Sequence, residues 1–397
     1  MRQRLVRLAF VPLLAAGCGS PPASPDGGAL DDGGRDLLPL PDLTTPADMA
    51  EPKPPALPQL YKNSGTVLTD VNMVTVTFDG YPYRGAAEAF GEFVFGSKWF
   101  PAVTAEYGIK SGTHVEAVRL ADKLDATMTD AQIAMLIEKH IQDGSLPAPS
   151  GRNFYYMVYF PSGTTISDGG SGGVSGASCS SFLGYHSEAK YMGTPFAYGV
   201  ICDCDDNQDT ITVTAAHELV EAATDPYPYT NPGYNLQPDP GDPWQIEIGQ
   251  ESADLCDAEG TIYENGVALQ RIWSNAAAAE GTSPCVPMPD PDYAAVFPVP
   301  YDIPTASAGD TVTFTLMGWT AGNAQSWDLT IGQASYVDYT PTEQQARLSA
   351  TTISPGDTVT LTMTVPRDAD QHSGSIEGVL IESTKFAHVW PVAYQIQ

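Results

Sequence analysis

A short segment in the middle of the chain carries the residues best suited to chemistry. It runs from Thr214 to Pro226 and reads TAAHELVEAATDP, and a helix through it places His217 and Glu221 one turn apart on one face. An imidazole and a carboxylate at this spacing form a metal-ligand pair, and Glu218 beside them is placed to act as a general base. The sequence therefore predicts a helix that binds one divalent metal ion and activates water.

A third ligand has to come from elsewhere, because a catalytic zinc site uses three protein ligands and leaves one position for water. The acidic segment QIEIGQESADLCD follows a proline-rich loop and offers Glu247, Glu251, Asp254 and Cys256. We expect Glu251 to be the ligand, with Asp254 as the next choice. Zinc is the expected metal, and an oxygen-rich ligand set also admits manganese or iron.

The alternative interpretation of the HELVE segment is a solvated helix face, since HExxE patterns also arise by chance. Its neighbours argue against this, because alanine, leucine and valine fill most of the positions around the three polar residues. A helix that is apolar nearly all round is usually buried. Buried carboxylates without partners are costly, and either a metal ion or a basic side chain would offset that cost.

Two other polar features are weaker candidates. Asp203, Asp205, Asn207 and Asp209 alternate as in the first half of a calcium loop, but the later glycine and glutamate of such a loop are missing. An acidic loop before a helix is the preferred interpretation, because aspartates favour helix N-termini. His186, in FLGYHSE, is interpreted as a loop histidine rather than a ligand, although it could reach the site.

The elements that position these residues alternate along the chain. Apolar periodicity predicts strands and helices in turn, and a Gly/Ser-rich loop separates the last two strands. Strands are predicted at 71–78, 114–120, 154–160 and 196–201, and helices at 86–107, at 129–144 and from about 209. This order is typical of the upper half of a zincin-like domain, the fold of many metallopeptidases, so we predict an α+β fold with a mixed sheet.

The beginning of the chain has the composition of an export signal. Residues 1–17 carry three arginines, an apolar run and then small residues directly before Cys18, which resemble a lipobox, the bacterial lipoprotein processing site. We expect a lipid on Cys18 to anchor the mature chain in the membrane, and an ordinary cleaved signal peptide is the alternative. Gly19 favours the outer membrane or cell surface. Residues 18–58, rich in proline and poor in aromatics, predict a disordered tether.

Charge and cysteine content fit an exported protein. The formal net charge is −30, which disfavours nucleic acid as a partner. Apart from the cysteine assigned to lipid, five cysteines remain, and export favours disulfides. We expect Cys256 to pair with Cys285, and Cys179 to pair with Cys202 or Cys204.

The residue pattern of the sequence changes near residue 289. SAGDTVTFTLMGW and SPGDTVTLTMTV repeat one pattern, a turn followed by alternating threonine and apolar residues, and further short strands are predicted at 327–331, 378–382 and 388–394. Residues 289–397 are therefore predicted to form an all-β immunoglobulin-like sandwich. It contains no cluster of catalytic residue types, so we expect a spacer or adhesion module.

Three motifs carry a resemblance to a known family. HELVEAATDP at 217–226, ESADLC at 251–256 and LQRIWSN at 269–275, with a downstream cysteine, resemble the HELAE, EIADLC and WIWSP segments of the EXORDIUM or phosphate-induced protein family of secreted proteins. The resemblance covers residues 60–288, and departs from the family in the spacing of Cys202 and Cys204 and in the added sandwich. It implies a cell-wall or surface role with no settled enzymatic activity. It also supports the pairing of Cys256 with Cys285.

Two functions remain open on the sequence alone. The first is a surface-anchored lipoprotein whose domain at 59–288 binds one divalent metal through His217, Glu221 and Glu251, with Glu218 activating water to hydrolyse a peptide or cell-wall substrate. The second is a noncatalytic EXORDIUM-like protein that uses the same fold for surface or matrix contact. An open metal position would favour the first.

Overall fold

The computed structural model describes residues 53–167, 176–237, 242–257, 259–287, 293–332, 346–367, 373–383 and 388–397. The predicted signal peptide, the lipid-bearing Cys18 and nearly all of the predicted tether lie outside these ranges. Residues Pro54–Gln397 belong to one compact unit. Within the described ranges, no helix combines the length and the apolar character needed to cross a bilayer.

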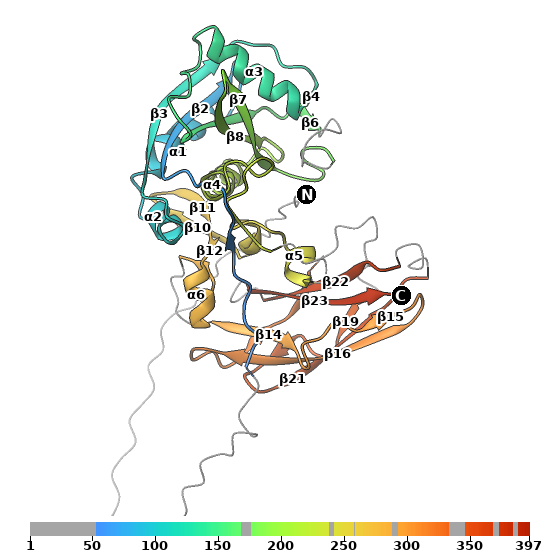
Figure 1. The fold of residues 1–397 in the computed structure, drawn as a ribbon. Coiled ribbons are helices and arrows are strands. Elements are labelled where there is room, and N and C mark those ends of the chain that lie inside the picture. Colours follow the sequence, from blue (N-terminus) through green and yellow to red (C-terminus); the bar gives the residue numbers. More distant parts are fainter. Residues whose placement is uncertain are drawn as a thin grey trace, which may run out of the picture. The chain divides into compact units, whose positions relative to one another are not determined.

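The first region is α+β and is built on a mixed, mainly parallel sheet (Figure 1). Its five strands lie in the order β3-β2-β5-β8-β7, and only the edge strand β7 is antiparallel to its neighbour. The strands are β2 (Asp70–Phe78), β3 (Ser111–Leu120), β5 (Phe154–Phe160), β7 (Gly184–Tyr191) and β8 (Thr194–Cys202). The four strands predicted from apolar periodicity are therefore confirmed, and β7 is an addition.

Helices cover both faces of this sheet, because its central strands are apolar on both sides. Every residue of β5 is buried: Tyr155 and Met157 pack with helices α1 and α4, while Tyr156 and Val158 pack with helix α3. The helices are α1 (Arg84–Val94), α2 (Trp99–Thr104), the short 3-10 helix η2 (Ala105–Tyr107), α3 (Asp130–Gln142) and α4 (Gln208–Thr224).

The predicted helix at 129–144 is confirmed as α3, and its start has the physical cause that the sequence indicated. The Thr129 hydroxyl accepts the Gln132 backbone N–H, and the Gln132 side chain accepts the Thr129 backbone N–H. The single helix predicted at 86–107 is wrong. It is divided into α1, α2 and η2, and the break falls at Gly96 and Ser97, where glycine disfavours a continuous helix.

Short elements follow α4 and return the chain to it. A hairpin of β10 (Thr261–Glu264) and β11 (Val267–Gln270) packs on α4 through β11. The other elements of the region are β1 (Tyr61–Lys62), β4 (Thr127–Thr129), β6 (Thr165–Ser167), β9 (Tyr234–Asn235), α5 (Pro243–Glu247), η3 (Asp254–Cys256), β12 (Ile272–Trp273), α6 (Asn275–Glu280) and β13 (Cys285–Val286).

The second region is mostly antiparallel β structure. Two four-stranded sheets, β14-β16-β21-β19 and β15-β23-β22-β18, and a separate β17-β20 pair make it up. The strands are β14 (Ala294–Pro298), β15 (Thr305–Ala306), β16 (Thr311–Thr320), β17 (Trp327–Asp328), β18 (Thr330–Gly332), β19 (Ala346–Leu348), β20 (Thr352–Ile353), β21 (Thr358–Thr364), β22 (Ile376–Ser383) and β23 (His388–Ile396). The two repeated patterns form neighbouring strands β16 and β21, and their threonines face outward while the alternate apolar residues are buried.

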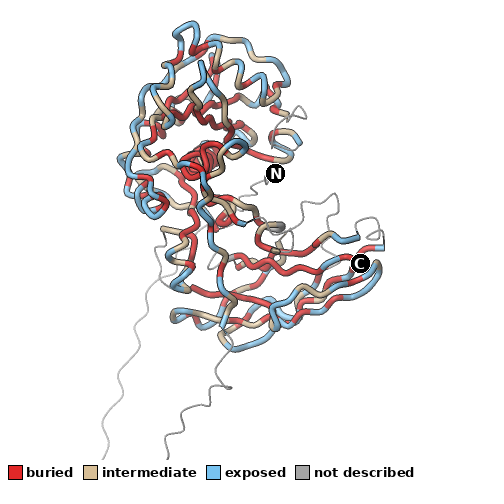
Figure 2. Tube along the Cα trace, in the orientation of Figure 1, coloured by how far each residue is buried: buried red, intermediate tan, exposed pale blue. Residues whose placement is uncertain are grey.

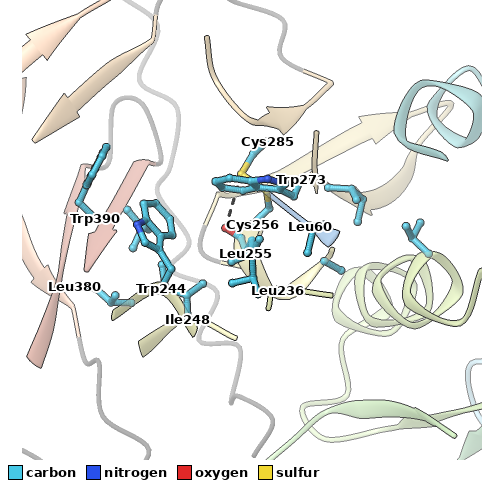
Figure 3. Close-up of a cluster of buried hydrophobic side chains, with 14 of the residues drawn as sticks. Leu60, Leu236, Trp244, Ile248, Leu255, Cys256, Trp273, Cys285, Leu380 and Trp390 are labelled. Atoms are coloured by element: carbon cyan, nitrogen blue, oxygen red, sulfur yellow. Dashed lines mark hydrogen bonds between the residues drawn. A yellow bond between two sulfur atoms is a disulfide. The ribbon is translucent and has the colours of Figure 1, made fainter. Parts of the chain in front are cut away.

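Tryptophan rings pack against helix α5 from both sides. The Trp244 ring lies 5.7 Å from that of Trp273 in β12 and 5.4 Å from that of Trp390 in β23, measured between ring centroids (Figure 3). All three rings are buried, and Leu380 of β22 belongs to the same hydrophobic cluster. The cluster supports the acidic segment that follows α5. The predicted boundary near residue 289 falls in 288–292, outside the described residues.

Candidate metal centre

Helix α4 places His217, Glu218 and Glu221 inside the protein. Its N-terminus is capped by Asn207, whose side chain accepts the Asp209 backbone N–H. Every residue from 210 to 224 is buried, and Figure 2 shows the helix buried along its length. The solvated-face interpretation is therefore wrong, because the apolar residues around the three polar ones pack against β8, β7, β11 and α1.

The pair predicted from spacing meets in the structure. His217 Nε2 lies 3.1 Å from Glu221 Oε1 and 3.7 Å from Asp254 Oδ1. Asp254 also donates its backbone N–H to Glu221 Oε1 at 3.2 Å, which orients that carboxylate. His217 Nε2 thus has one oxygen of Glu221 and one of Asp254 within 4 Å, and an imidazole beside carboxylates is a ligand combination of divalent metal sites.

A glutamine that the sequence analysis did not single out orients His217. Gln270, at the end of β11, donates its side-chain N–H to the Ala253 carbonyl at 2.7 Å and turns its oxygen to His217 Nδ1, 2.9 Å away. Nδ1 therefore carries a proton, and Nε2 is the nitrogen that a metal ion can bind. Burial lowers the pKa of His217, but the Glu221 and Glu218 carboxylates outweigh it and raise the pKa well above its usual range, so an ion would displace the proton on Nε2. A hydrogen-bond acceptor behind the distal nitrogen is the usual support of a metal-binding histidine.

The acidic segment contributes two carboxylates in different places. The Asp254 Oδ2 atom accepts the backbone N–H groups of Gln250 and Glu251 at 3.2 and 3.4 Å, which leaves Oδ1 toward His217. Glu251, the preferred third ligand from sequence, instead has Oε1 3.6 Å from His186 Nε2. Asp254, the second choice, is thus the carboxylate of this segment that stands beside His217.

His186 belongs to the cluster, and its interpretation as a loop histidine is wrong. It lies in β7, is 3% exposed, and has Nδ1 3.6 Å from Glu221 Oε2 and 3.9 Å from Glu218 Oε2. Its Nε2 lies 2.9 Å from the Asp225 carbonyl oxygen. The missed signal is a hairpin: Met192 and Gly193 form a turn between two runs of strand residues, and recognising it would have placed His186 in a strand beside α4.

The described side chains form two groups of candidate ligands that share Glu221. His217, Glu218 and Glu221 are one group, and His186, Glu221 and Glu251 are the other; in each, one ligand atom per residue lies within 4.8 Å of the others. All five side chains are buried. The cluster therefore has the composition and the spacing of a metal site.

Burial changes the proton affinities of these carboxyl groups. Loss of water raises the pKa of Glu218 to about 8 and that of Asp254 to about 7, and raises that of Glu251 well above its usual range. Burial acts on Glu221 as well, but the His217 and His186 imidazoles outweigh it and hold its pKa to about 2. Glu221 is thus the carboxylate most firmly kept in the ionised form that a metal requires.

Several atoms of the cluster have no hydrogen-bond partner although they are buried. They are His186 Nδ1, Glu218 Oε2, Glu221 Oε2 and Glu251 Oε1. Unpaired buried polar atoms are costly, and in the described part of the chain no lysine or arginine forms an ion pair with these carboxylates. A divalent cation is the partner whose charge and coordination number fit them.

Two of the alternating aspartates before α4 accept hydrogen bonds from protein groups. Asp205 accepts the backbone N–H of Asn207 and the hydroxyl of Thr210, and Asp209 accepts the hydroxyl of Tyr263. These hydrogen bonds agree with the acidic loop that the sequence analysis preferred to a calcium loop.

The described residues contain two disulfides. Cys256 pairs with Cys285, and Cys179 pairs with Cys204. Cys202, which the sequence analysis counted as an alternative disulfide partner, is a buried free thiol, and burial raises its pKa to about 12. Cys256 is therefore not a thiolate ligand, and its disulfide instead ties the end of the acidic segment to β13.

Removing the Cys256–Cys285 disulfide by the double serine substitution is expected to destabilise the first region. The disulfide spans 29 residues, and closing a loop of that length in the unfolded chain contributes about 3–4 kcal/mol. The melting temperature should fall on the order of 10 °C. Calorimetry measures it, and Cys202→Ala, which removes only a free thiol, should cause a smaller decrease. An equal decrease in both variants would contradict the prediction.

Replacing Gln270 by alanine should weaken metal binding roughly 10–100-fold, the usual effect of losing the hydrogen-bond partner of a metal-binding histidine. His217 would keep its position on α4 and lose the acceptor that fixes its tautomer. Chelator-competition titration with Zn²⁺ measures the affinity. Gln245→Ala is the matched control, because Gln245 donates to the Gln237 carbonyl away from the cluster. Unchanged affinity in Gln270→Ala would show that His217 needs no such support.

Comparisons with known proteins add little to this geometry. No protein-family model matches the chain, and no curated protein matches it either. Among solved structures, the chain is similar to the crystal structure of domains 4 and 5 of the S-layer protein SbsC. The identity is 13%, the TM-score is 0.18, and the match covers 35% of this chain and 91% of that chain. A likeness this distant supports no functional conclusion, so function has to be argued from the cluster.

Proposed function

We propose that this protein is an exported metalloprotein whose α+β region hydrolyses a peptide or a similar bond. The observation that carries the proposal is the orientation of His217: Gln270 holds Nδ1, and Nε2 faces Glu221 and Asp254. His217 and Glu221 on one helix and Asp254 from the acidic segment would hold the ion. Asp254 thus replaces Glu251 as the proposed third ligand of this ion.

Glu218 would act as the general base. Its pKa of about 8 in the buried cluster lies near neutral pH, where a carboxylate accepts a proton most effectively. A bound zinc or similar ion would supply an activated water and polarise the substrate carbonyl. The side chains of His217 and Asp254 are 11% and 16% exposed, so solvent reaches this end of the cluster. A small substrate group would approach from the same end.

The fold and location are parts of the same proposal. A mixed sheet with a buried HExxE helix against it supports a zincin-like region, and two sheets of short strands support an immunoglobulin-like sandwich. The motifs shared with EXORDIUM proteins support a surface role, and two disulfides fit an oxidising compartment. The lipid anchor on Cys18 would hold the protein at the outer membrane or cell surface. Peptide or cell-wall material is the proposed substrate, and nucleic acid is not.

The second candidate function is noncatalytic surface contact, with the ion in a structural role. Deep burial favours it, because Glu218, Glu221 and Glu251 are at most 5% exposed, and structural metal sites are closed.

Metal analysis tests the proposal. The full-length protein, purified in detergent, should contain bound zinc, manganese or iron, and His217→Ala should lose most of it. His114→Ala is the matched control, because His114 in β3 contacts the Thr75 hydroxyl instead of the cluster. Metal contents that are equal in all three proteins would refute the proposal.

The anchor is tested separately on the same preparation. Mass spectrometry of its N-terminal peptide should show a diacylglyceryl group on Cys18. An unmodified mature N-terminus would refute the anchor and leave the metal centre untouched.

A further inference from the structure

The two oxygens of Glu221 face different histidines. Oε1 lies 3.1 Å from His217 Nε2, and Oε2 lies 3.6 Å from His186 Nδ1. Oε1 also accepts the Asp254 backbone N–H, whereas Oε2 has no hydrogen bond although Glu221 is fully buried. A carboxylate with both oxygens directed at imidazole nitrogens has the arrangement of a bridging ligand, since two-metal sites share ligands between their ions.

Each histidine has a hydrogen-bond acceptor at the ring nitrogen that is turned away from Glu221. The outer nitrogen of His217 is bonded to the Gln270 side chain, and that of His186 lies 2.9 Å from the Asp225 carbonyl, which can only accept a hydrogen. Nε2 of His186 therefore carries a proton, which leaves Nδ1 as the nitrogen that a metal ion can bind. That Nδ1 has no hydrogen-bond partner and faces Glu221 Oε2. Each of the two histidines thus has the support that a metal-binding histidine usually has.

We propose that the cluster binds two divalent ions bridged by Glu221. The first is the ion of the proposed function, on His217, Glu221 Oε1 and Asp254. The second takes His186, Glu221 and Glu251, each of which offers one ligand atom within 4.8 Å of the others. The inference rests on the proposed function and extends it from one ion to two.

Charge supports two ions over one. Four carboxylates, Glu218, Glu221, Glu251 and Asp254, are gathered with two imidazoles and no lysine or arginine ion pair among the described residues. Once metal ions displace the protons of these groups, two divalent ions balance the four carboxylates, whereas one ion leaves two negative charges beside Asp225 and Asp257 in a region with little access to water. Uncompensated buried charge is strongly unfavourable. Two histidines with four carboxylates also form the ligand set of dimetal carboxylate proteins.

The second ion lies deeper than the first. His186 and Glu251 are 3% and 5% exposed, and the carbonyl that supports His186 belongs to Asp225 at the C-terminal end of α4. The outer position keeps the partial exposure of His217 and Asp254. The inner ion would therefore orient Glu221 and add positive charge, while the outer position meets solvent and substrate.

Counting ions per chain tests the inference. The full-length protein, stripped with chelator in detergent and reloaded with Zn²⁺ alone, should bind two ions per chain by native mass spectrometry. His186→Ala and Glu251→Gln should each bind one, and His114→Ala should still bind two. Reloading with Mn²⁺ should produce the electron paramagnetic resonance spectrum of an exchange-coupled pair, and His186→Ala should reduce it to that of an isolated ion.

The possible outcomes distinguish a failure of the two-ion inference from a failure of the proposed function. One ion in the full-length protein, with His186→Ala also binding one, overturns the second site and leaves the proposed function standing. One ion that is lost in His186→Ala also overturns it, because a single ion would then be shared by both histidines. No ion in the full-length protein overturns both. Glu251→Gln keeps the volume of its side chain and serves if His186→Ala does not fold, as judged by circular dichroism.

Discussion

Replacing Glu221 by glutamine is expected to empty the metal centre almost completely. Glu221 belongs to both groups of candidate ligands and is the carboxylate whose pKa the two histidines hold lowest, so no neighbour can take its place. Glutamine keeps the volume and still offers an oxygen to the Asp254 N–H, which preserves the packing of α4. The affinity for Zn²⁺ should fall by more than the roughly 10–100-fold caused by losing a supporting hydrogen bond.

Stability provides a second measurement of the same change. A ligand that binds only the folded state stabilises it by about 4 kcal/mol at a thousand times its dissociation constant. Added Zn²⁺ should therefore raise the melting temperature of the native protein and leave that of Glu221→Gln unchanged. Glu138→Gln is the matched control, because Glu138 lies on α3, against the opposite face of the sheet. A Zn²⁺-dependent rise in Glu221→Gln equal to that of the native protein would contradict the role of Glu221.

The sequence predicted the helices and strands that are determined by residues close together in the chain. Helix α3 begins at a capping box formed within four residues, and β5 is a run of apolar residues long enough for a strand buried on both faces. The edge strand β7 carries polar residues such as Glu188 and Lys190 in its less buried half, and this weakens its apolar alternation. The break between α1 and α2 was missed because alanine and aromatic residues continue on both sides of Gly96.

The residues of the cluster also differ in how far the sequence could predict them. The i, i+4 spacing on one helix was sufficient to pair His217 with Glu221, because helical geometry alone sets their separation. His186 and Gln270 lie 31 and 53 residues from His217 along the chain and reach it only through sheet order and the β10–β11 hairpin. Glutamine has no ligand chemistry of its own that a motif search would detect. Its role exists only in the folded protein, where it accepts from one histidine.

Replacing Glu218 by glutamine should abolish most hydrolysis without removing the metal. A positioned general base contributes typically about 10²–10⁴-fold to the rate, so kcat should fall by that factor while zinc content and KM stay close to native values. Glutamine matches the shape of glutamate and cannot take a proton. Fluorescence of a quenched peptide library, incubated with the Zn²⁺-loaded full-length protein, would identify a substrate and then compare the two proteins. Loss of metal in this variant would make Glu218 a ligand instead of a base.

The dependence of hydrolysis on pH shows whether Glu218 acts as a base or only fills space in the cluster. Burial raises the pKa of Glu218 to about 8, and a bound cation would lower it again by favouring the carboxylate. Since the base works when deprotonated, native activity should rise with pH along a limb whose midpoint lies below 8, and Glu218→Gln should lack that limb. Equal activity and equal profiles would exclude Glu218 as the base. If the metal-loaded native protein cleaves no peptide, the noncatalytic surface function is favoured, since a buried metal centre would then serve the fold of the α4 region.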